Sequence, residues 1–178
     1  IDIKKGGNSM RNLMRESIHE SGDYMEVDVF PVRKTSCSRS AKAKPTRPVQ
    51  QLLNERNSAR KLTWLIQENF GPKDYMCELS YPADFPYDKA VTGREFSCFL
   101  RNVKNAYKKA NIDFRSIYIP EIGEKNGRPH YHLVCSGELG AQILKDKWNK
   151  RFTDNPKVSY IHTSHLVFTK TGLAGAAF

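Results

Sequence analysis

The residues best suited to chemistry are two histidines that flank a tyrosine in the stretch "GRPHYHLV". This stretch follows a turn and reads as the start of a strand. Residues two positions apart on a strand point to the same face, so the imidazoles of His130 and His132 are close enough to share one ion. Tyr131 points to the opposite face. The pair alone does not distinguish a metal site from two neighbouring polar side chains.

A carboxylate on the preceding strand could complete a metal site. Glu121 ends that strand, and a hairpin would bring it back beside the histidines. Two imidazoles and a carboxylate leave coordination positions open for water or a phosphate oxygen, as a catalytic metal requires. This mixed nitrogen and oxygen ligand set suits Mn²⁺ or Mg²⁺. The sequence therefore predicts a divalent metal site at Glu121, His130 and His132.

The position of Glu121 depends on how its strand alternates. Strict alternation puts Glu121 on the same face as Ile117 and Ile119, which look like core residues. Either the strand bulges near Pro120 or the isoleucines line the active face. Glu78, on the polar side of an earlier strand, is the rival carboxylate.

The sequence predicts six elements that contain these residues. In order, they are a strand at 74–82, a helix at 92–110, strands at 114–121 and 129–136, a helix at 139–150 and a strand at 157–167. The order is that of a ferredoxin-like (RRM-like) α+β fold. It predicts an antiparallel sheet with its helices on one face, which leaves the other face open for a substrate. Asn126-Gly127 readily adopts positive φ and favours a hairpin between the third and fourth elements of this series.

Two of these elements have a well-defined buried side. On the first strand, alternation directs Tyr75, Cys77, Leu79 and Tyr81 to the core and leaves Glu78 and Ser80 on a more polar face. On the first helix, the i, i+3, i+4 pattern predicts a buried side made of Phe96, Phe99, Leu100, Val103 and Tyr107. Thr92 and Glu95 have the spacing of a capping box at its start.

The N-terminal part of the chain is basic. The 178 residues carry a formal charge of +10, which favours an anionic partner. Residues 33–47 lack apolar side chains to bury and are expected to form a flexible arm, which is either a linker or a DNA contact. Its basic residues are Arg33, Lys34, Arg39, Lys42, Lys44 and Arg47.

A helix is expected from about residue 49 to 70, with one apolar side made of Leu52, Leu53, Ala59, Leu62, Leu65, Ile66 and Phe70. We expect an extension at 1–47 and a domain at 48–178.

Other classes of protein are disfavoured. No window approaches the roughly 20 consecutive apolar residues that cross a bilayer, and no N-terminal block resembles a signal peptide. The four cysteines, Cys37, Cys77, Cys98 and Cys135, lie far apart and indicate reduced thiols. A cytoplasmic protein without a membrane partner is the expectation.

Longer stretches resemble a known family. "PEIGEKNGRPHYHLV" resembles the metal-binding motif of HUH endonucleases, the rolling-circle replication initiators of plasmids and viruses, in which two histidines around a bulky residue follow an upstream Glu and a G-x-P turn. "CELSYP" resembles their first motif. The run "LNERNSARKLTWLIQENFGPKDYMCELSY" resembles the replication-associated proteins of bacterial plasmids, integrative elements and phages. The resemblance extends from about Met25 to the C-terminus.

The resemblance implies a sequence-specific endonuclease that nicks and rejoins single-stranded DNA at a replication origin and so initiates rolling-circle replication. Mn²⁺ or Mg²⁺, held by His130, His132 and a carboxylate, would polarise a phosphodiester, and a tyrosine would attack its phosphorus. The products would be a 5′-phosphotyrosine and a free 3′-OH. The expected partners are single-stranded or hairpin origin DNA, a helicase and the host polymerase. Further DNA contacts are expected at Ser80, Arg128 and Lys170.

The nucleophile is the part of the family pattern that is missing. The family places it on a helix after the metal motif, but Tyr160, the only tyrosine downstream, reads as a strand residue. The segment "TKTGLAGAAF" resembles the start of that helix, so we expect the tyrosine at or just after Phe178. Either the sequence stops just before the tyrosine, or Phe178 stands in place of it. In both cases we expect residues 1–178 to bind metal and DNA but cleave poorly. A relaxase-like order would use Tyr24 instead. Tyr87 is expected to be an ordinary surface residue.

Two other functions compete with this one. A metal-free RRM-like module would hold single-stranded nucleic acid on its open sheet face by stacking and charge, although the central strands lack an RNP-like aromatic motif. A structural or partner-binding domain would need the histidines for no chemistry. His162 and His165, on the last expected strand, could border the site or be ordinary solvated histidines.

Overall fold

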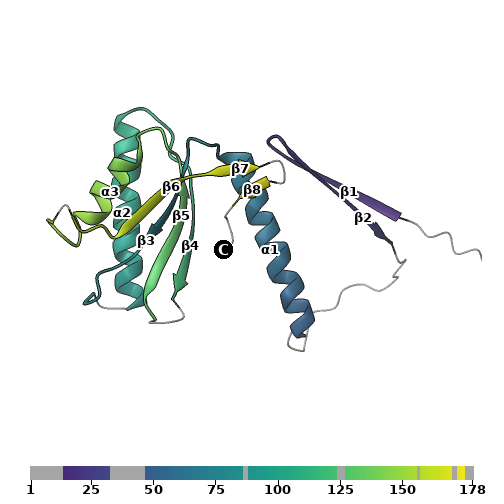
Figure 1. Ribbon diagram of the computed structural model, residues 1–178, viewed down its shortest axis with the longest axis horizontal. Helices are drawn as coiled ribbons and strands as arrows, with labels where there is room; N and C mark the ends of the chain where they lie inside the picture. The colour runs from purple at the N-terminus through teal and green to yellow at the C-terminus, as the bar shows by residue number, and fades with distance from the viewer. Residues whose placement is uncertain are drawn as a thin grey trace, which may run out of the picture. The chain divides into compact units, whose positions relative to one another are not determined.

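The computed structural model describes residues 14–32, 47–85, 88–123, 127–155, 157–169 and 172–174 (Figure 1). The chain divides into two compact units, Ile1–Arg60 and Lys61–Phe178, which we describe in turn. None of the helices in the described ranges combines the length and the apolar composition that crossing a bilayer requires. Cys77, Cys98 and Cys135 are free thiols, and Cys37 lies outside the described residues.

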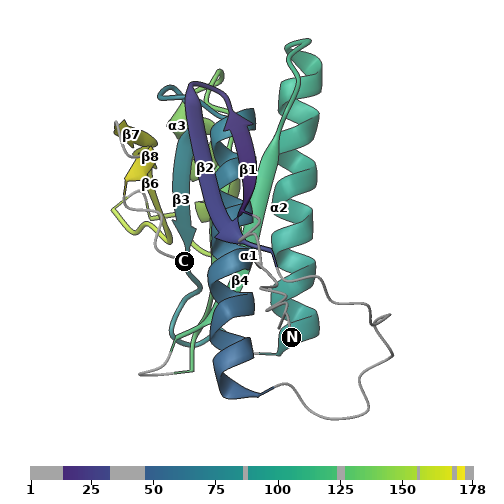
Figure 2. The ribbon, with the colours of Figure 1, turned by 90° about the vertical axis from the view of Figure 1, so that its right-hand side faces the viewer.

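The first unit contains a β-hairpin that the sequence analysis did not anticipate. Strands β1 (Met14–Ser21) and β2 (Tyr24–Pro31) pair antiparallel along their whole length, and Figure 2 shows them side by side. They are joined by a two-residue turn in which Gly22 adopts a φ of 56°, a conformation that costs glycine little. Helix α1 (Pro48–Asn69) begins in this unit, and Arg60 on it forms ion pairs with Glu26, at 2.7 Å, and with Asp28.

The second unit has the predicted ferredoxin-like fold. Its four-stranded sheet has the order β4-β5-β3-β6, with every neighbouring pair antiparallel. The strands are β3 (Tyr75–Leu79), β4 (Ser116–Ile122), β5 (Pro129–Cys135) and β6 (Ile161–His165), and the helices are α2 (Lys89–Lys109) and α3 (Ala141–Asn149). The order β3-α2-β4-β5-α3-β6 is the predicted one. A short pair, β7 (Val167–Thr169) and β8 (Gly172–Ala174), follows.

Helices α2 and α3 cover one face of this sheet, as Figure 1 shows. The predicted core residues of β3 and α2 are confirmed: Cys77, Leu79, Tyr81, Phe96, Phe99, Val103 and Tyr107 are all buried, and Tyr75 and Leu100 are partly buried against them. The ring of Tyr131 on β5 stacks on Phe96 of α2 with centroids 3.9 Å apart and planes 3° apart. This contact secures the middle of β5 to the helix layer.

The other face of the sheet is only partly open, because the second half of α1 lies against it (Figure 1). Ile66 and Phe70 form a second core cluster with Val134 of β5 and with Leu166. Of the apolar side that we expected for α1, Ile66 and Phe70 are buried and Leu62 is partly buried. Leu52, Leu53 and Leu65 are exposed. The two helices of the β-α-β-β-α-β unit share one face as predicted, and α1 is an additional element on the opposite face.

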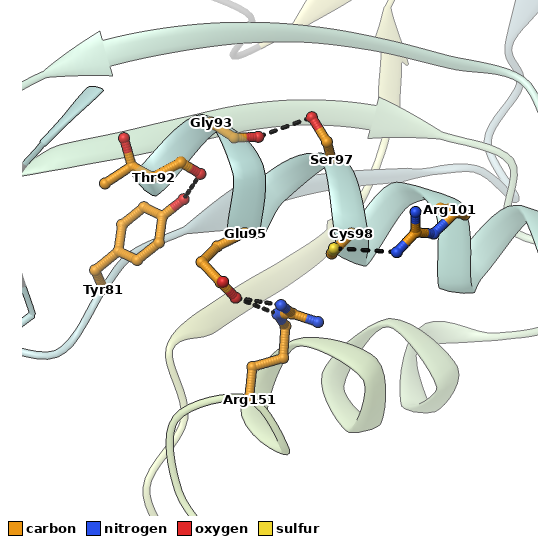
Figure 3. Close-up of polar contacts among 8 residues, drawn as sticks. All are labelled: Tyr81, Thr92, Gly93, Glu95, Ser97, Cys98, Arg101 and Arg151. Atoms are coloured by element: carbon orange, nitrogen blue, oxygen red, sulfur yellow. Dashed lines mark hydrogen bonds and ion pairs between the residues drawn. The ribbon is translucent and has the colours of Figure 1, made fainter. Parts of the chain in front are cut away.

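The predicted capping box at Thr92 and Glu95 is wrong, because α2 begins earlier. The Oδ1 atom of Asp88 accepts hydrogen bonds from the backbone N–H groups of Ala90 and Val91, so Asp88 is the N-cap. Thr92 is buried in the first turn, and its carbonyl accepts a 2.7 Å hydrogen bond from Tyr81 Oη. Glu95 forms an ion pair with Arg151, directly after α3, as Figure 3 shows.

Candidate metal centre

The hairpin of β4 and β5 places a carboxylate beside the two histidines. The register pairs Ile117 with Val134, Ile119 with His132 and Glu121 with His130, without a bulge. Residues directly opposite each other in an antiparallel pair share a face. The isoleucines therefore lie on the same face as the histidines, which settles the question that the alternation raised. Gly127 in the connecting turn has a φ of 64°, and Asn126 lies outside the described residues.

The three candidate ligands converge. One ligand atom from each of Glu121, His130 and His132 lies within 4.8 Å of the other two. Glu121 Oε2 is 2.6 Å from His132 Nε2, and the two imidazole rings have centroids 5.9 Å apart. The side chain of Glu121 is 50% exposed and that of His132 20% exposed. We call these three residues the triad.

The chemistry of the triad fits a divalent cation. A hydrogen bond between Nε2 and Oε2 requires one proton between them, and a cation would take the place of that proton. At a metal–ligand distance of about 2.1 Å and an octahedral angle, adjacent ligand atoms stand about 3.0 Å apart. The 2.6 Å contact needs to open by only a few tenths of an ångström to reach that separation. Small side-chain rotations are therefore enough to bring the ligand atoms of Glu121 and His132 to the spacing that a cation requires, and a ligand atom of His130 lies within 4.8 Å of both.

The rival carboxylate, Glu78, lies on the same face but one strand further across the sheet. In the register it stands opposite His132 of β5 on one side and His162 of β6 on the other. Within the described ranges, the converging group contains Glu121 and not Glu78. His162 is exposed on the triad's face. The ring of His165 instead lies with its centroid 4.4 Å from that of Tyr75, which packs against the core under α2 and α3. Of these two histidines, only His162 borders the triad's face.

The six described tyrosines of the second unit lie against the core under α2 and α3: Tyr75, Tyr81, Tyr107, Tyr118, Tyr131 and Tyr160. Burial raises the pKa of Tyr131, which keeps its hydroxyl neutral. The ring of Tyr160 meets Phe152 edge to face, in agreement with a structural role. Among these described residues, no tyrosine shares the triad's face. Tyr24 lies on β2 of the first unit, and Tyr87 and Phe178 lie outside the described residues.

The residues expected to contact DNA are only partly described. Arg33, Lys34, Arg39, Lys42, Lys44 and Lys170 lie outside the described residues. Arg47 directly precedes α1, and its carbonyl accepts hydrogen bonds from the first turn. Arg128 is exposed two residues before His130, and the hydroxyl of Ser80 donates to the carbonyl of Tyr160 at 3.3 Å. Ser80 directly follows Leu79, which pairs with Tyr131, so Ser80 and Arg128 both lie at the end of the sheet that contains His130.

Sequence reasoning missed how the triad's face is bounded. Val134 follows His132 on the same face and is buried under Ile66 of α1. The signal was present, because the residues of β5 on this face change from histidine to valine toward the end of the strand. One end of this face is therefore covered, while the triad stays accessible.

A family model for the replication-associated protein ORF2 matches residues 74–170, more than half of the chain. The matched range contains the whole ferredoxin-like sheet and the triad. Searches of curated proteins and of solved structures gave no match. The chain therefore belongs to the replication-associated protein ORF2 family, which indicates a role in the initiation of DNA replication.

Proposed function

We propose that the protein is a metal-dependent HUH endonuclease that nicks and rejoins single-stranded DNA at a replication origin and so initiates rolling-circle replication. The observation that carries the proposal is the convergence of Glu121, His130 and His132 on one sheet face in a member of a replication-associated family. Residues 48–178 would form the endonuclease domain, and residues 1–47 an extension with a basic arm.

The triad would hold Mn²⁺ or Mg²⁺. Two neutral imidazoles and one carboxylate contribute a single negative charge, so a divalent site keeps a net positive charge that attracts a phosphodiester. The bound cation would neutralise the charge that builds on the phosphate oxygens during displacement. The exposure of Glu121 leaves room for a DNA strand to approach from the solvent.

The proposed reaction is a transesterification. A tyrosine hydroxyl loses its proton and its oxygen bonds to phosphorus, while the bond from phosphorus to the 3′ oxygen breaks and that oxygen takes up a proton. The 5′-phosphotyrosine keeps the energy of the phosphodiester, so the 3′-OH can reverse the step and rejoin the strand. Because the described tyrosines of the second unit lie on the other face, we assign the nucleophile to a tyrosine just after Phe178 or to one in whose place Phe178 stands, as in HUH initiators. Tyr24 would serve in a relaxase-like order.

The test is a search for the covalent adduct. The protein at its full natural length would be incubated with Mn²⁺ and a pool of single-stranded oligonucleotides of randomised sequence, and then run on a denaturing gel. A label at the 3′ end of the DNA should migrate with the protein, whereas a label at the 5′ end should appear on a shorter free strand. His130→Ala and His132→Ala should abolish the adduct. Glu78→Gln, the control on the same face, should retain it.

The position of the nucleophile follows from the same gel. Loss of the adduct in Tyr24→Phe would support the relaxase-like order, and its loss in a Phe variant of a tyrosine near position 178 would support the order of HUH initiators. Single-strand binding without any adduct, unaffected by His130→Ala or by removal of metal, would contradict the proposal and favour the metal-free module.

A further inference from the structure

The outer side of α2 carries a stripe of positive charge that no part of the proposed reaction uses. Arg94, Arg101, Lys104 and Lys108 are all exposed and recur at spacings of seven, three and four residues, so they lie on one side of the helix. We call these four residues the α2 stripe. They lie opposite the buried side of the helix that contains Phe99 and Val103, and therefore face solvent.

Negative charge is scarce around the α2 stripe. Helix α2 contains six basic residues and a single acidic one, Glu95. Glu95 is engaged with Arg151, and Figure 3 shows Glu95 and Ser97 leaving the helix on different sides. Within the described part of the chain, no carboxylate forms an ion pair with any residue of the stripe. Its charge is therefore available to a ligand.

The stability of the helix explains only Lys108 of the α2 stripe, because a cation in the last turn interacts favourably with the helix dipole. Arg101 and Lys104 stand three residues apart, and Lys104 and Lys108 stand four apart, so like charges face each other and destabilise the helix. Arg101 also contacts Cys98 Sγ at 3.2 Å, which engages one of its five N–H donors. A surface depression lined by Ser97, Leu100, Arg101, Lys104 and Asn105 lies along the same side of the helix.

We propose that the α2 stripe is a second DNA-binding surface, which binds the phosphate backbone of duplex DNA. From Arg94 to Lys108 the helix rises about 21 Å, which matches the rise of about six base pairs. Surfaces that hold single strands combine positive charge with aromatic side chains on which bases stack. The stripe has serine and asparagine between its cations instead, a composition that suits phosphate contacts without base stacking.

The two DNA surfaces would lie on opposite faces of the sheet. Helix α2 covers the face that contains Tyr131, whereas the triad lies on the face that contains Val134 (Figure 1). The protein could thus hold a duplex flank of an origin on α2 while a separate single strand approaches the triad. This inference rests on membership of a replication-associated family and does not depend on the nicking reaction.

The test measures how the affinity for a 20-base-pair duplex depends on salt, by fluorescence anisotropy in the presence of EDTA. The variant Arg94→Gln, Arg101→Gln, Lys104→Gln and Lys108→Gln keeps good helix formers and removes four charges. The control variant Lys61→Gln, Lys73→Gln, Lys150→Gln and Lys157→Gln removes the same charge from other exposed positions. Circular dichroism melts establish that both variants are folded.

We expect the slope of log K against log salt to become shallower by about 3 to 4 in the stripe variant, since each lost duplex phosphate contact changes it by about 0.9. The control should change it by less than about one, and binding of a single strand of the same sequence should change less than duplex binding. A slope equal to that of the wild type, or an equal change in the control, would overturn the proposal. The double variant His130→Ala with His132→Ala should bind the duplex in EDTA as the wild type does. The outcome of this test is therefore independent of whether the triad binds a metal.

Discussion

Metal binding by the triad should be visible as thermal stabilisation that depends on Glu121 and not on Glu78. Glu121→Gln and Glu78→Gln are the same substitution on one sheet face. Only Glu121 belongs to the converging group among the described residues, whereas Glu78 stands opposite His132 on the neighbouring strand. The two variants form a matched pair in which the position of the carboxylate is the single difference.

The expected size of the effect follows from linkage. A ligand present at 100 times its dissociation constant stabilises the folded state by about 2.7 kcal/mol. For a chain of 178 residues, about 3 °C of melting temperature corresponds to 1 kcal/mol, so Mn²⁺ should raise the wild-type Tm by about 8 °C. If Glu121→Gln weakens binding about 100-fold, the same Mn²⁺ concentration supplies only about 0.4 kcal/mol, or about 1 °C. Glu78→Gln should keep most of the wild-type rise.

The assay is a melt of each protein in EDTA and in Mn²⁺, and the quantity compared is the difference between the two. This difference removes the effect of losing the hydrogen bond between His132 Nε2 and Glu121 Oε2, which is partly exposed and which the variant lacks in both conditions. Equal loss of the Mn²⁺ response in the two variants would refute the assignment of Glu121. A wild type without any response would refute the metal site itself.

Two further predictions concern the scaffold. Gly137→Ala should lower the free energy of unfolding in urea melts by about 3 kcal/mol or more, because a Cβ there would lie 1.9 Å from the backbone oxygen of Lys73. In the control, Gly71→Ala, the Cβ would meet open space, and the free energy of unfolding should change by less than about 0.5 kcal/mol. Similar stabilities for the two variants would contradict this packing. Burial raises the pKa of Tyr107 to about 12 from an ordinary value of 10, and its hydroxyl donates to the Ser136 carbonyl at 2.6 Å. Since the raised pKa belongs to the folded state, the neutral hydroxyl of Tyr107 stabilises the fold fully below pH 10, and this stabilisation is lost as the pH rises to about 12. Tyr107→Phe should therefore show a smaller loss of stability across that interval, and an unchanged pH profile would argue against the shift.

The parts of the fold that were predictable are those in which one local pattern decides the outcome. Alternation along β3 separated Leu79 from Glu78, and alternation along β5 separated Tyr131 from the histidines, because a residue on a paired strand has only two faces to choose from. The order of the elements then sufficed for the sheet, since β-α-β-β-α-β allows few arrangements.

The parts that were missed depend on contacts between distant segments. The apolar side of α1 continues along the whole helix, and its sequence does not show that Ile66 meets the sheet while Leu52 remains exposed. Asp88 and Thr92 both have the chemistry of an N-cap, and the hydrogen bond from Tyr81 helps to hold Thr92 inside the helix. The spacing of Glu121 and the histidines was compatible with either a bulge or a regular ladder, and the register decided between them.

The order of the strands has a consequence for how quickly a bound ion could exchange. The two histidines lie on β5, which pairs with β4 on one side and with β3 on the other, so amide hydrogens of this strand should exchange with solvent only on extensive unfolding. Glu121 lies on β4, one of the two edge strands of the four-stranded sheet, and its side chain is half exposed. An edge strand opens at a lower free-energy cost than a central one. The carboxylate is therefore the ligand that would detach first, and release of the ion would be limited by motion of β4 while the imidazoles stay in place.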